Sequence, residues 1–395
     1  MKSFLENPLF TKIADIYKII EFQKIIGKHN GAVEFIIELS NGYYLSGGCE
    51  KTLILYDNQF MEKIKIKDIN DWAFNVIEKG RYNKKTNKIE LLCCTNEEIR
   101  LINLDTELFR TDIQQYELPK KTTTNSIEMK ENNYIMIGLG GCSYFIDLFN
   151  KNGHLTEYKI TDKTYRGAIK ISDKIVALSS NIIIPNGENK LIFYNIKSKK
   201  ISNEINGYSF TISNNNLALI SREEIKRNYK ILLCACKQYR NGQKNGILLI
   251  NPNLADNKRI ENEFYETNEF EVYCFCQILK VENRNINLEV IDEEYKKGIK
   301  ISKSDYFFVG GLDKEKREGM IKLFKVVYGE KIWEAKIEFI QDIVIDENQK
   351  FEEFDGPISS IYQSKTTGHI IATSYSGNVY LFTVPNLDFY LNRVE

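Results

Sequence analysis

The chain has 395 residues and a formal net charge of zero, from 54 basic and 54 acidic side chains. With 43% hydrophobic and 27% charged residues, its composition is that of a globular protein. It has no run of about 18 uncharged apolar residues that could span a bilayer, and its neutral balance gives no overall attraction to nucleic acid. We therefore expect neither stable membrane insertion nor nucleic-acid binding.

The chain begins with a stretch that does not read as a targeting segment. Glu6, Lys12, Asp15 and Lys18 interrupt its apolar residues, so the core of a signal peptide is missing. Within it, Phe10 to Phe22 fits a helix and a strand equally well, since its apolar residues keep helical spacing but are also strand formers. The length of the whole chain predicts either repeats or more than one domain.

Residues 29–57, HNGAVEFIIELSNGYYLSGGCEKTLILYD, predict a unit of three antiparallel strands. Asn-Gly at residues 41–42 separates two apolar runs, and this pair is a strong hairpin signal because both central residues of a tight hairpin turn need positive φ. A Gly-Gly turn then leads into LILYD, which ends at Asp57.

This last strand recurs along the chain as a short apolar run that often closes on Asp or Asn. Its closing positions are Asp57, Asn103, Asp147, Asn195, Asn251, Lys325 and Thr383. The successive spacings are 46, 44, 48, 56, 74 and 58 residues. A period of about 45 residues with several short strands is typical of a propeller blade, whereas helical repeats are shorter. The sequence therefore predicts an all-β fold, a seven-bladed β-propeller of four-stranded antiparallel blades.

Residues 29–57 resemble a repeat of the WD-repeat β-propeller family, and the unit that starts at Gly356 is a second match. The family's buried network of Asp, His, Ser or Thr, and Trp would hold Glu50 and Tyr56 in place of Asp and Trp, so we expect it to be weakened. The residues that carry the resemblance are His29, Gly31, Ser46, Gly47, Lys51, Thr52, Tyr56 and Asp57.

The resemblance also implies how the ring is closed, since the family supplies one outer strand of the last blade from the N-terminus. Residues 16–22, IYKIIEF, are well placed for this role. We therefore expect a single domain over residues 1–395, with an insertion at 281–305 in the sixth blade and a tail at 385–395. Closure removes a sheet edge, and we expect the protein by itself to be a monomer.

Chemistry is sparsely represented in the sequence. Histidine occurs only at positions 29, 154 and 369, and each is expected to be structural. Cys234 with Cys236 and Cys274 with Cys276 could in principle bind zinc, but they stand in apolar runs where cysteine behaves as a small hydrophobe. We expect no metal, no cofactor and no catalytic residues, and free thiols in a cytoplasmic or nuclear protein.

By resemblance, the leading functional hypothesis is a non-catalytic scaffold for protein–protein interaction. One alternative is a propeller-fold hydrolase or a lectin-like glycan binder, which would need carboxylates that converge on one rim. A second is a phosphoinositide-binding propeller, whose paired-arginine motif is matched only by Arg166-Gly167, because Tyr165 stands in place of the second arginine.

The partner is expected to be another protein, bound through the longer connections of the fifth to seventh blades. Two of these connections, the insertion 281–305 and the acidic segment 346–356, combine charges with apolar residues, as interface cores and rims do. The basic segment 78–88 of the second unit is expected to be a solvated loop. The candidate binding residues are Ile286, Leu288, Val290, Ile291, Phe351 and Phe354.

Overall fold

The computed structural model describes most of the chain between residues 21 and 383. The described residues are 21–67, 69, 72–83, 85–95, 98–117, 125–130, 133–137, 143–147, 158–159, 165–180, 189–211, 213, 215–224, 227–238, 244–252, 262–281, 301–328, 335–343 and 354–383.

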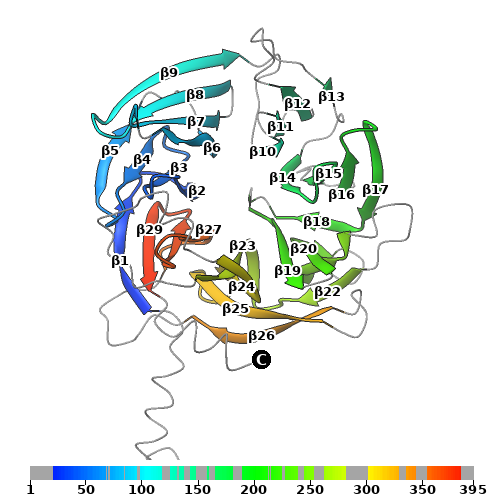
Figure 1. Ribbon diagram of the computed structural model, residues 1–395. Coiled ribbons are helices and arrows are strands. Elements are labelled where there is room, and N and C mark those ends of the chain that lie inside the picture. The colour runs from blue at the N-terminus through cyan, green and yellow to red at the C-terminus, as the bar shows by residue number, and fades with distance from the viewer. Residues whose placement is uncertain are drawn as a thin grey trace, which may run out of the picture.

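The described strands form seven antiparallel sheets arranged as blades around an axis (Figure 1). From the inside outward, blade one contains β2 (Val33–Glu38), β3 (Tyr44–Gly48), β4 (Leu53–Tyr56) and β5 (Glu62–Ile66). Blade two contains β6 (Ala73–Asn83), β7 (Lys88–Thr95), β8 (Glu98–Asp105) and β9 (Arg110–Glu117). Blade three contains β10 (Asn125–Lys130), β11 (Asn133–Ile137), β12 (Ser143–Asp147) and β13 (Tyr158–Lys159). Blade four contains β14 (Tyr165–Lys170), β15 (Ile175–Ser180), β16 (Lys190–Asn195) and β17 (Lys200–Asn206). In blade five, β18 (Tyr208–Phe210) and β19 (Leu217–Glu224) both pair with β20 (Arg227–Gln238), and β21 (Lys244–Ile250) and β22 (Asn262–Glu266) follow outward. Blade six contains β23 (Phe270–Val281), β24 (Ile301–Asp313), β25 (Gly319–Val327) and β26 (Lys336–Asp342). Blade seven contains β27 (Ile358–Gln363), β28 (Ile370–Ser374), β29 (Asn378–Thr383) and β1 (Glu21–Lys28).

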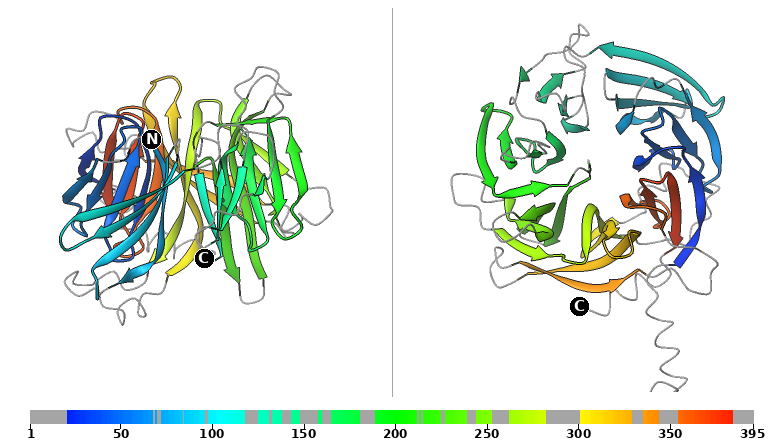
Figure 2. Two further views of the ribbon diagram at one scale, coloured as in Figure 1. Left: turned by 90° about the horizontal axis from the view of Figure 1, so that it is seen from above. Right: turned by 180° about the vertical axis from the view of Figure 1, so that it is seen from behind.

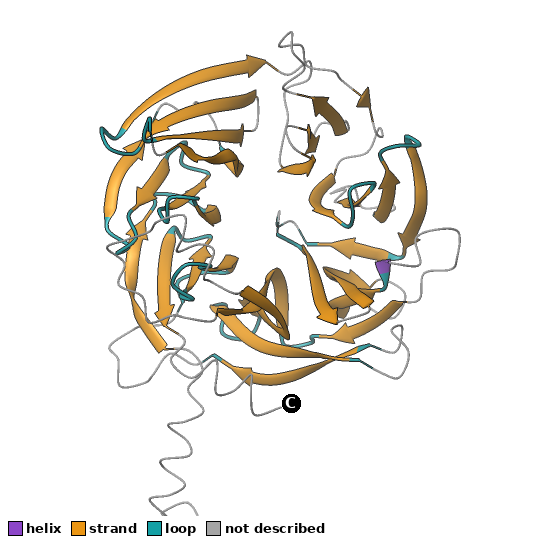
Figure 3. Ribbon diagram, in the orientation of Figure 1, coloured by secondary structure: helices purple, strands orange, loops and turns teal. Residues whose placement is uncertain are grey.

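The all-β propeller predicted from the repeat is confirmed, and each predicted third strand is the third strand of its blade. Besides strands, the described residues contain a short 3-10 turn at Pro252, drawn in purple in Figure 3, and no α-helix occurs among them. In that part of the chain, no helix has the length and apolar character needed to cross a membrane.

The ring is closed by an N-terminal strand, as predicted, but at a different position. Strand β1 pairs antiparallel with β29, from Glu21 opposite Thr383 to Lys28 opposite Asn378. The predicted strand 16–22 overlaps it by only two residues, and 16–20 lie outside the described residues. The prediction placed the closing strand too early in the chain, because Gln23 and Lys24 separate Phe22 from Ile25 and Ile26 and so hide the strand pattern.

Two other predicted boundaries also shift. The insertion 281–305 is shorter, because Val281 ends β23 and residues 301–305 begin β24, with Val281 opposite Ile301 in the ladder. The basic segment 78–88 was expected to be a loop, but its start and end belong to the β6–β7 hairpin, where Asn83 pairs with Lys88. The tail 385–395 lies outside the described residues.

The hydrophobic core consists of layers between neighbouring blades. One layer joins blades one and two through side chains such as Leu45 and Leu91, and another joins blades six and seven through Phe308 and Tyr380. Strand β4 is buried along its whole length, because a blade in a ring has a neighbour on each face. Burial of both faces explains why the third strands read as unbroken apolar runs.

The strand order gives the ring two distinct faces. The connections that lead into each inner strand, and those between second and third strands, lie on one face, which we call the entry face. The turns between first and second strands, and between third and fourth strands, lie on the other, which we call the hairpin face. The left view of Figure 2 shows the ring edge-on, with strands running between these faces.

Removal of β1 should open the ring. A chain that starts at residue 29 leaves β29 with an unpaired edge, so we expect a lower melting temperature and concentration-dependent association, because exposed edges pair with other chains. A chain that starts at residue 21 keeps β1 and is the control. Differential scanning calorimetry and size-exclusion chromatography measure both effects; equal melting temperatures for the two truncations would contradict this closure.

Candidate functional site

A one-residue bulge recurs near the start of the inner strands, at the entry face. The ladder between first and second strands shifts register around a single residue in five blades. Bulges re-aim side chains and leave main-chain groups outside the ladder. The residues at these shifts are Glu34, Phe74, Arg166, Tyr273 and Ser359.

Glu34 is the buried carboxylate of this group, with 8% of its surface exposed. Its Oε1 accepts a weak hydrogen bond from Cys49 Sγ at 3.9 Å. Burial raises the pKa of Glu34 to about 7, and the positive charge of Arg166 opposes this shift. Burial and the nearby Glu34 charge raise the pKa of Cys49 to about 12, so this thiol is a poor nucleophile.

Tyr273 and Ser359 stand at the bulges of blades six and seven, and Tyr375 follows β28 at the same face of the ring. The rings of Tyr273 and Tyr375 meet edge to face, with centroids 5.6 Å apart. Ser359 donates from Oγ to the main-chain oxygen of Val33 at 2.5 Å, which links blade seven to blade one. Arg166-Gly167, the partial match to the phosphoinositide motif, begins inner strand β14 and is half-buried beside a carboxylate, so it does not present an outward-facing anion site.

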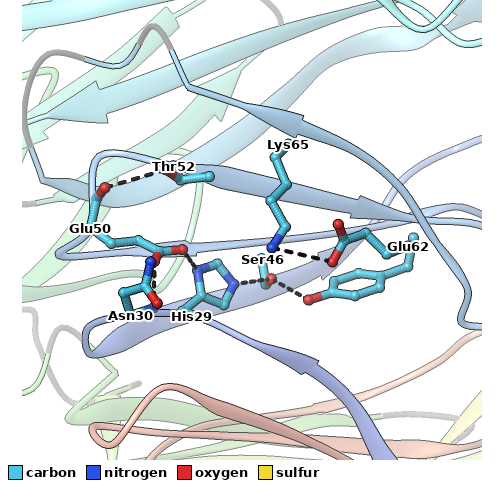
Figure 4. Close-up of polar contacts among 8 residues, drawn as sticks. His29, Asn30, Ser46, Glu50, Thr52, Glu62 and Lys65 are labelled. Atoms are coloured by element: carbon cyan, nitrogen blue, oxygen red, sulfur yellow. Dashed lines mark hydrogen bonds and ion pairs between the residues drawn. The ribbon is translucent and has the colours of Figure 1, made fainter.

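The network predicted to be weakened in blade one is connected in the structure. Figure 4 shows His29 between Glu50 and Ser46. His29 Nδ1 faces Glu50 Oε1, Nε2 lies 2.8 Å from Ser46 Oγ, and Ser46 Oγ donates to Tyr56 Oη at 3.3 Å. The second Glu50 oxygen accepts from the Asn30 main-chain nitrogen at 2.5 Å. Glu50 and Tyr56 therefore make the contacts expected of Asp and Trp.

This Glu–His–Ser order is also that of a hydrolase triad, but its burial gives it a structural role. Ser46 is 0% exposed and His29 is 1% exposed, so a substrate could not reach the hydroxyl. Burial lowers the pKa of His29, against the opposing effect of Glu50. The hydrolase hypothesis also needed convergent carboxylates, whereas Asp57 accepts from the Gln59 and Met61 nitrogens of its own turn at 2.9 Å.

A second polar pattern, near the hairpin face, ties neighbouring blades together. Glu38 ends β2 and accepts from the Lys365 nitrogen at 2.6 Å, the Thr366 nitrogen at 3.2 Å and Ser364 Oγ at 3.2 Å, all in the first turn of blade seven. Glu78, in β6 of blade two, has the equivalent role: it accepts hydrogen bonds from the nitrogen and the hydroxyl of Ser40 in blade one. Each carboxylate therefore caps the turn of the preceding blade.

Glutamine takes this role in blades six and seven. Gln277 accepts from the Ser221 nitrogen at 3.3 Å and donates to its oxygen at 2.9 Å. Gln363 accepts from the Leu279 nitrogen at 2.6 Å and donates to its oxygen at 3.0 Å. All four capping residues stand four positions after the bulge. Sequence reasoning missed this pattern, although the alignment of VEFIIE, AFNVIE, VYCFCQ and ISSIYQ could have shown it.

Three hairpins extend the hairpin face beyond the others. The pairing of β6 with β7 continues to Asn83 opposite Lys88, that of β19 with β20 to Glu224 opposite Arg227, and that of β23 with β24 to Val281 opposite Ile301. Strand β24 is 13 residues long, whereas β28 of the next blade has 5. Blades five and six therefore carry adjacent long hairpins.

The predicted binding residues are only partly placed by the structure. Ile286, Leu288, Val290, Ile291 and Phe351 lie outside the described residues. Phe354 was predicted to be a binding anchor, but it is 6% exposed and packs edge to face on Tyr380, with ring centroids 5.1 Å apart. It belongs to the core between blades six and seven, and the acidic residues before it in the sequence gave a misleading impression of exposure.

The paired cysteines point into different cores. Cys234 and Cys236 pack between blades four and five, whereas Cys274 packs between blades six and seven, with Cys276 against the same cluster. A single four-thiolate site is therefore excluded by their placement. Burial raises the pKa of Cys274 and Cys234 well above the usual value of a thiol.

Comparison with known proteins places the fold. No family profile and no curated protein sequence matches the chain. Two solved structures are similar across nearly the whole chain. The β-propeller domain of Cps50 (Swd1) from Myceliophteria thermophila has a TM-score of 0.56 and 9% identity, covering 92% of this chain and 99% of that one. The WD40 domain of Pan2 from Neurospora crassa has a TM-score of 0.53 and 8% identity, covering 90% of both chains. The chain therefore has the fold of a WD-repeat β-propeller.

Loss of the Glu38 carboxylate should destabilise the ring. Glu38→Ala leaves the Lys365 and Thr366 nitrogens without their acceptor, and an unsatisfied part-buried donor costs about 1–3 kcal/mol, so we expect a loss of about 2 kcal/mol in the free energy of unfolding. Exposed Glu62→Ala is the control and should change it by less than about 0.5 kcal/mol. Urea denaturation measures both; equal effects would contradict the capping role.

Glu34 should make stability depend on pH near neutrality. Because its pKa rises on folding from 4.5 to about 7, its contribution is fully present below 4.5 and is lost as the pH rises through 7. The difference is 2.5 units (7 minus 4.5), and each unit corresponds to about 1.4 kcal/mol, so wild type should lose on the order of 3 kcal/mol relative to Glu34→Gln between pH 4.5 and 8.

Urea denaturation of both proteins over this pH range measures the difference. His29 has a lowered pKa and acts in the opposite direction, but it is present in both proteins and cancels. Parallel pH profiles for wild type and Glu34→Gln would show that the carboxylate titrates as in the unfolded chain.

Proposed function

We propose that the protein is a non-catalytic scaffold that binds another protein through the long hairpins of blades five and six. The observation that carries the proposal is the β23–β24 hairpin, whose pairing continues to Val281 opposite Ile301. Surface hairpins and exposed strand edges are common sites of recognition by other proteins.

The polar contacts between blades are consistent with a rigid platform. Glu38, Glu78, Gln277 and Gln363 join blades through main-chain groups, so the hairpins are held by a fixed ring. A rigid base lowers the conformational entropy that binding must overcome. The buried free thiols fit a reducing compartment, which we propose to be the cytoplasm or nucleus.

The proposal favours a scaffold over a hydrolase on one specific ground. In the described group with the order of a catalytic triad, formed by His29, Ser46 and Glu50, the histidine and the serine are buried. A scaffold needs no such access, because recognition uses surface area and shape.

The test removes the hairpin tip without disturbing the blade. Since Val281 and Ile301 face each other in the ladder, residues 282–300 can be replaced by Asn-Gly, which closes a two-residue hairpin. The matched control shortens the hairpin of blade two by replacing residues 84–87 with Asn-Gly, which joins the paired Asn83 and Lys88 and keeps the core residue Ile89.

Affinity purification of both variants and wild type, with quantitative mass spectrometry, gives the outcome. We expect the first variant to lose at least one partner that wild type and the control retain, with unchanged melting temperature. Retention of every partner by a folded first variant would refute binding through the tip of this hairpin.

A further inference from the structure

Lysines gather at the hairpin-face end of blade four. This end consists of the β14–β15 turn, residues 171–174, and the β16–β17 turn, residues 196–199. The two turns are joined, because the Ile196 nitrogen donates to the Lys174 oxygen at 2.9 Å. Lys230 of blade five reaches the same end, where its Nζ donates to the Ile171 oxygen at 2.9 Å. We call this group the lysine patch, and its members are Lys170, Lys174, Lys197, Lys199, Lys200 and Lys230.

Little negative charge offsets the lysine patch. Asp173 is the acidic residue of the two turns, and it pairs with Lys170 at 2.8 Å. Six lysines and one aspartate leave a net charge of +5, in a chain whose total charge is zero. The neighbouring hairpin of blade five adds three basic and two acidic residues at 222–227, so it does not balance the patch. The exposed members that form no ion pair with any described residue are Lys174, Lys197 and Lys200.

The turn between the third and fourth strands differs in charge from the same turn of other blades. In blades one and two it begins with Asp57 and Asp105, whose Oδ1 atoms accept hydrogen bonds from main-chain nitrogens of the turn. In blade four Asn195 stands at this place, and its Oδ1 accepts from the Ser198 nitrogen at 3.0 Å. The turn is therefore capped in all three blades, but in blade four the cap brings no carboxylate charge beside the lysines.

An exposed aliphatic side chain adjoins the patch. Ile201 follows Lys200 in β17, the outermost strand of the blade (Figure 1), and 47% of its surface is exposed. Ile205 of the same strand is buried in the core between blades four and five. Lysines beside an exposed aliphatic group are typical of surfaces that bind a bilayer, because the charges attract anionic headgroups and the apolar group enters the interface.

The composition of the patch favours a lipid surface over nucleic acid. Lysine is a strongly hydrated point charge, which suits a layer of mobile headgroups. Nucleic-acid surfaces instead use arginine for bidentate contacts with bases and aromatic side chains for stacking on them. The two turns of the patch contain neither arginine nor an aromatic residue.

We propose that the lysine patch and Ile201 form a peripheral binding surface for a bilayer that contains anionic phospholipids. The lysines contact the headgroups, and Ile201 enters the interface between headgroups and acyl chains. The contact is reversible, since charge attraction and one aliphatic side chain bind far less firmly than an inserted helix. Blade five separates this surface from the β23–β24 hairpin of blade six, so the proposal does not depend on the scaffold function.

Co-sedimentation of the full chain with vesicles measures this contact. Vesicles of phosphatidylcholine alone are compared with vesicles of equal parts phosphatidylcholine and phosphatidylserine. The patch variant removes the three exposed lysines that form no ion pair with described residues, by Lys174→Gln, Lys197→Gln and Lys200→Gln. The matched control removes the same charge from lysines of that kind on blades seven, two and six, by Lys24→Gln, Lys88→Gln and Lys336→Gln.

Wild type and the control should bind the phosphatidylserine vesicles equally and should not bind phosphatidylcholine alone. The patch variant should bind roughly 100-fold more weakly, because each lysine near an anionic surface contributes about fivefold. High salt should release wild type, since it screens the charges. Ile201→Ser should weaken vesicle binding severalfold and leave binding to poly-glutamate unchanged, because only the bilayer takes up an apolar side chain.

Several results would overturn the proposal. Equal losses for the patch variant and the control would show that net charge, and not the patch, drives the contact. Unchanged vesicle binding by the patch variant, or no binding by wild type, would show that the patch does not meet the bilayer. Tighter binding of wild type to poly-glutamate or to single-stranded DNA than to the vesicles, lost in the patch variant, would assign the patch to an acidic protein or to a nucleic acid.

Discussion

The pairing of β1 with β29 is the contact on which the other features of this fold depend. A blade buries both faces only when it has a neighbour on each side, so blades one and seven need the ring to be closed. Gln23 and Thr383 are 360 positions apart in the chain, yet they lie in the same sheet, where Gln23 Nε2 donates to Thr383 Oγ1 at 3.0 Å. Ser359 and Glu38 then join blade seven to blade one at the two faces, and neither contact could form in an open chain of blades.

The polar groups are divided between the two faces in different ways. Near the hairpin face, carboxylates and amides cap main-chain groups of the preceding blade, and the contacts are local to one blade boundary. At the entry face, Asn215 of blade five donates from Nδ2 to the main-chain oxygens of Glu34 in blade one and Ser359 in blade seven, and so joins blades that are not neighbours. The buried Glu34 lies below it, where the pKa near 7 shows how much burial disfavours the charge. The entry face thus carries polar contacts that span several blades, and the hairpin face is extended.

Most of the architecture could be predicted from the sequence repeat, because a strand buried on both faces must be apolar throughout and must recur at blade spacing. LILYD and VYLFT are readable for this reason. Glu50 and Tyr56 were harder to interpret, because a family signature records residue types, whereas the network needs only an acceptor for His29 and a hydroxyl or ring NH beside Ser46. Phe354 was misplaced because two aromatics in a short acidic segment, Phe351 and Phe354, give no period to read.

The contacts of Asn215 were beyond sequence reasoning for a different reason. TISNNN is polar and lacks periodicity, which is typical of a surface turn, and only the register of β18 and β19 against β20 shows that it interrupts an inner strand. The acceptors for Asn215 are main-chain atoms, which leave no trace in residue types. The capping residues four positions after the bulge were accessible in principle, but the bulge that sets their alignment is a property of the ladder.

A disulfide trap across the closing strands tests the single ring most directly. Glu21→Cys and Thr383→Cys place two thiols at directly opposite ladder positions of β1 and β29, close enough for a disulfide. Under mild oxidation at low protein concentration, the double variant should form an intramolecular disulfide between these positions, identified by mass spectrometry of the linked peptides, and remain a monomer. Formation of only intermolecular disulfides, or of none while the protein stays folded, would contradict the closure of the ring by residues 21–28.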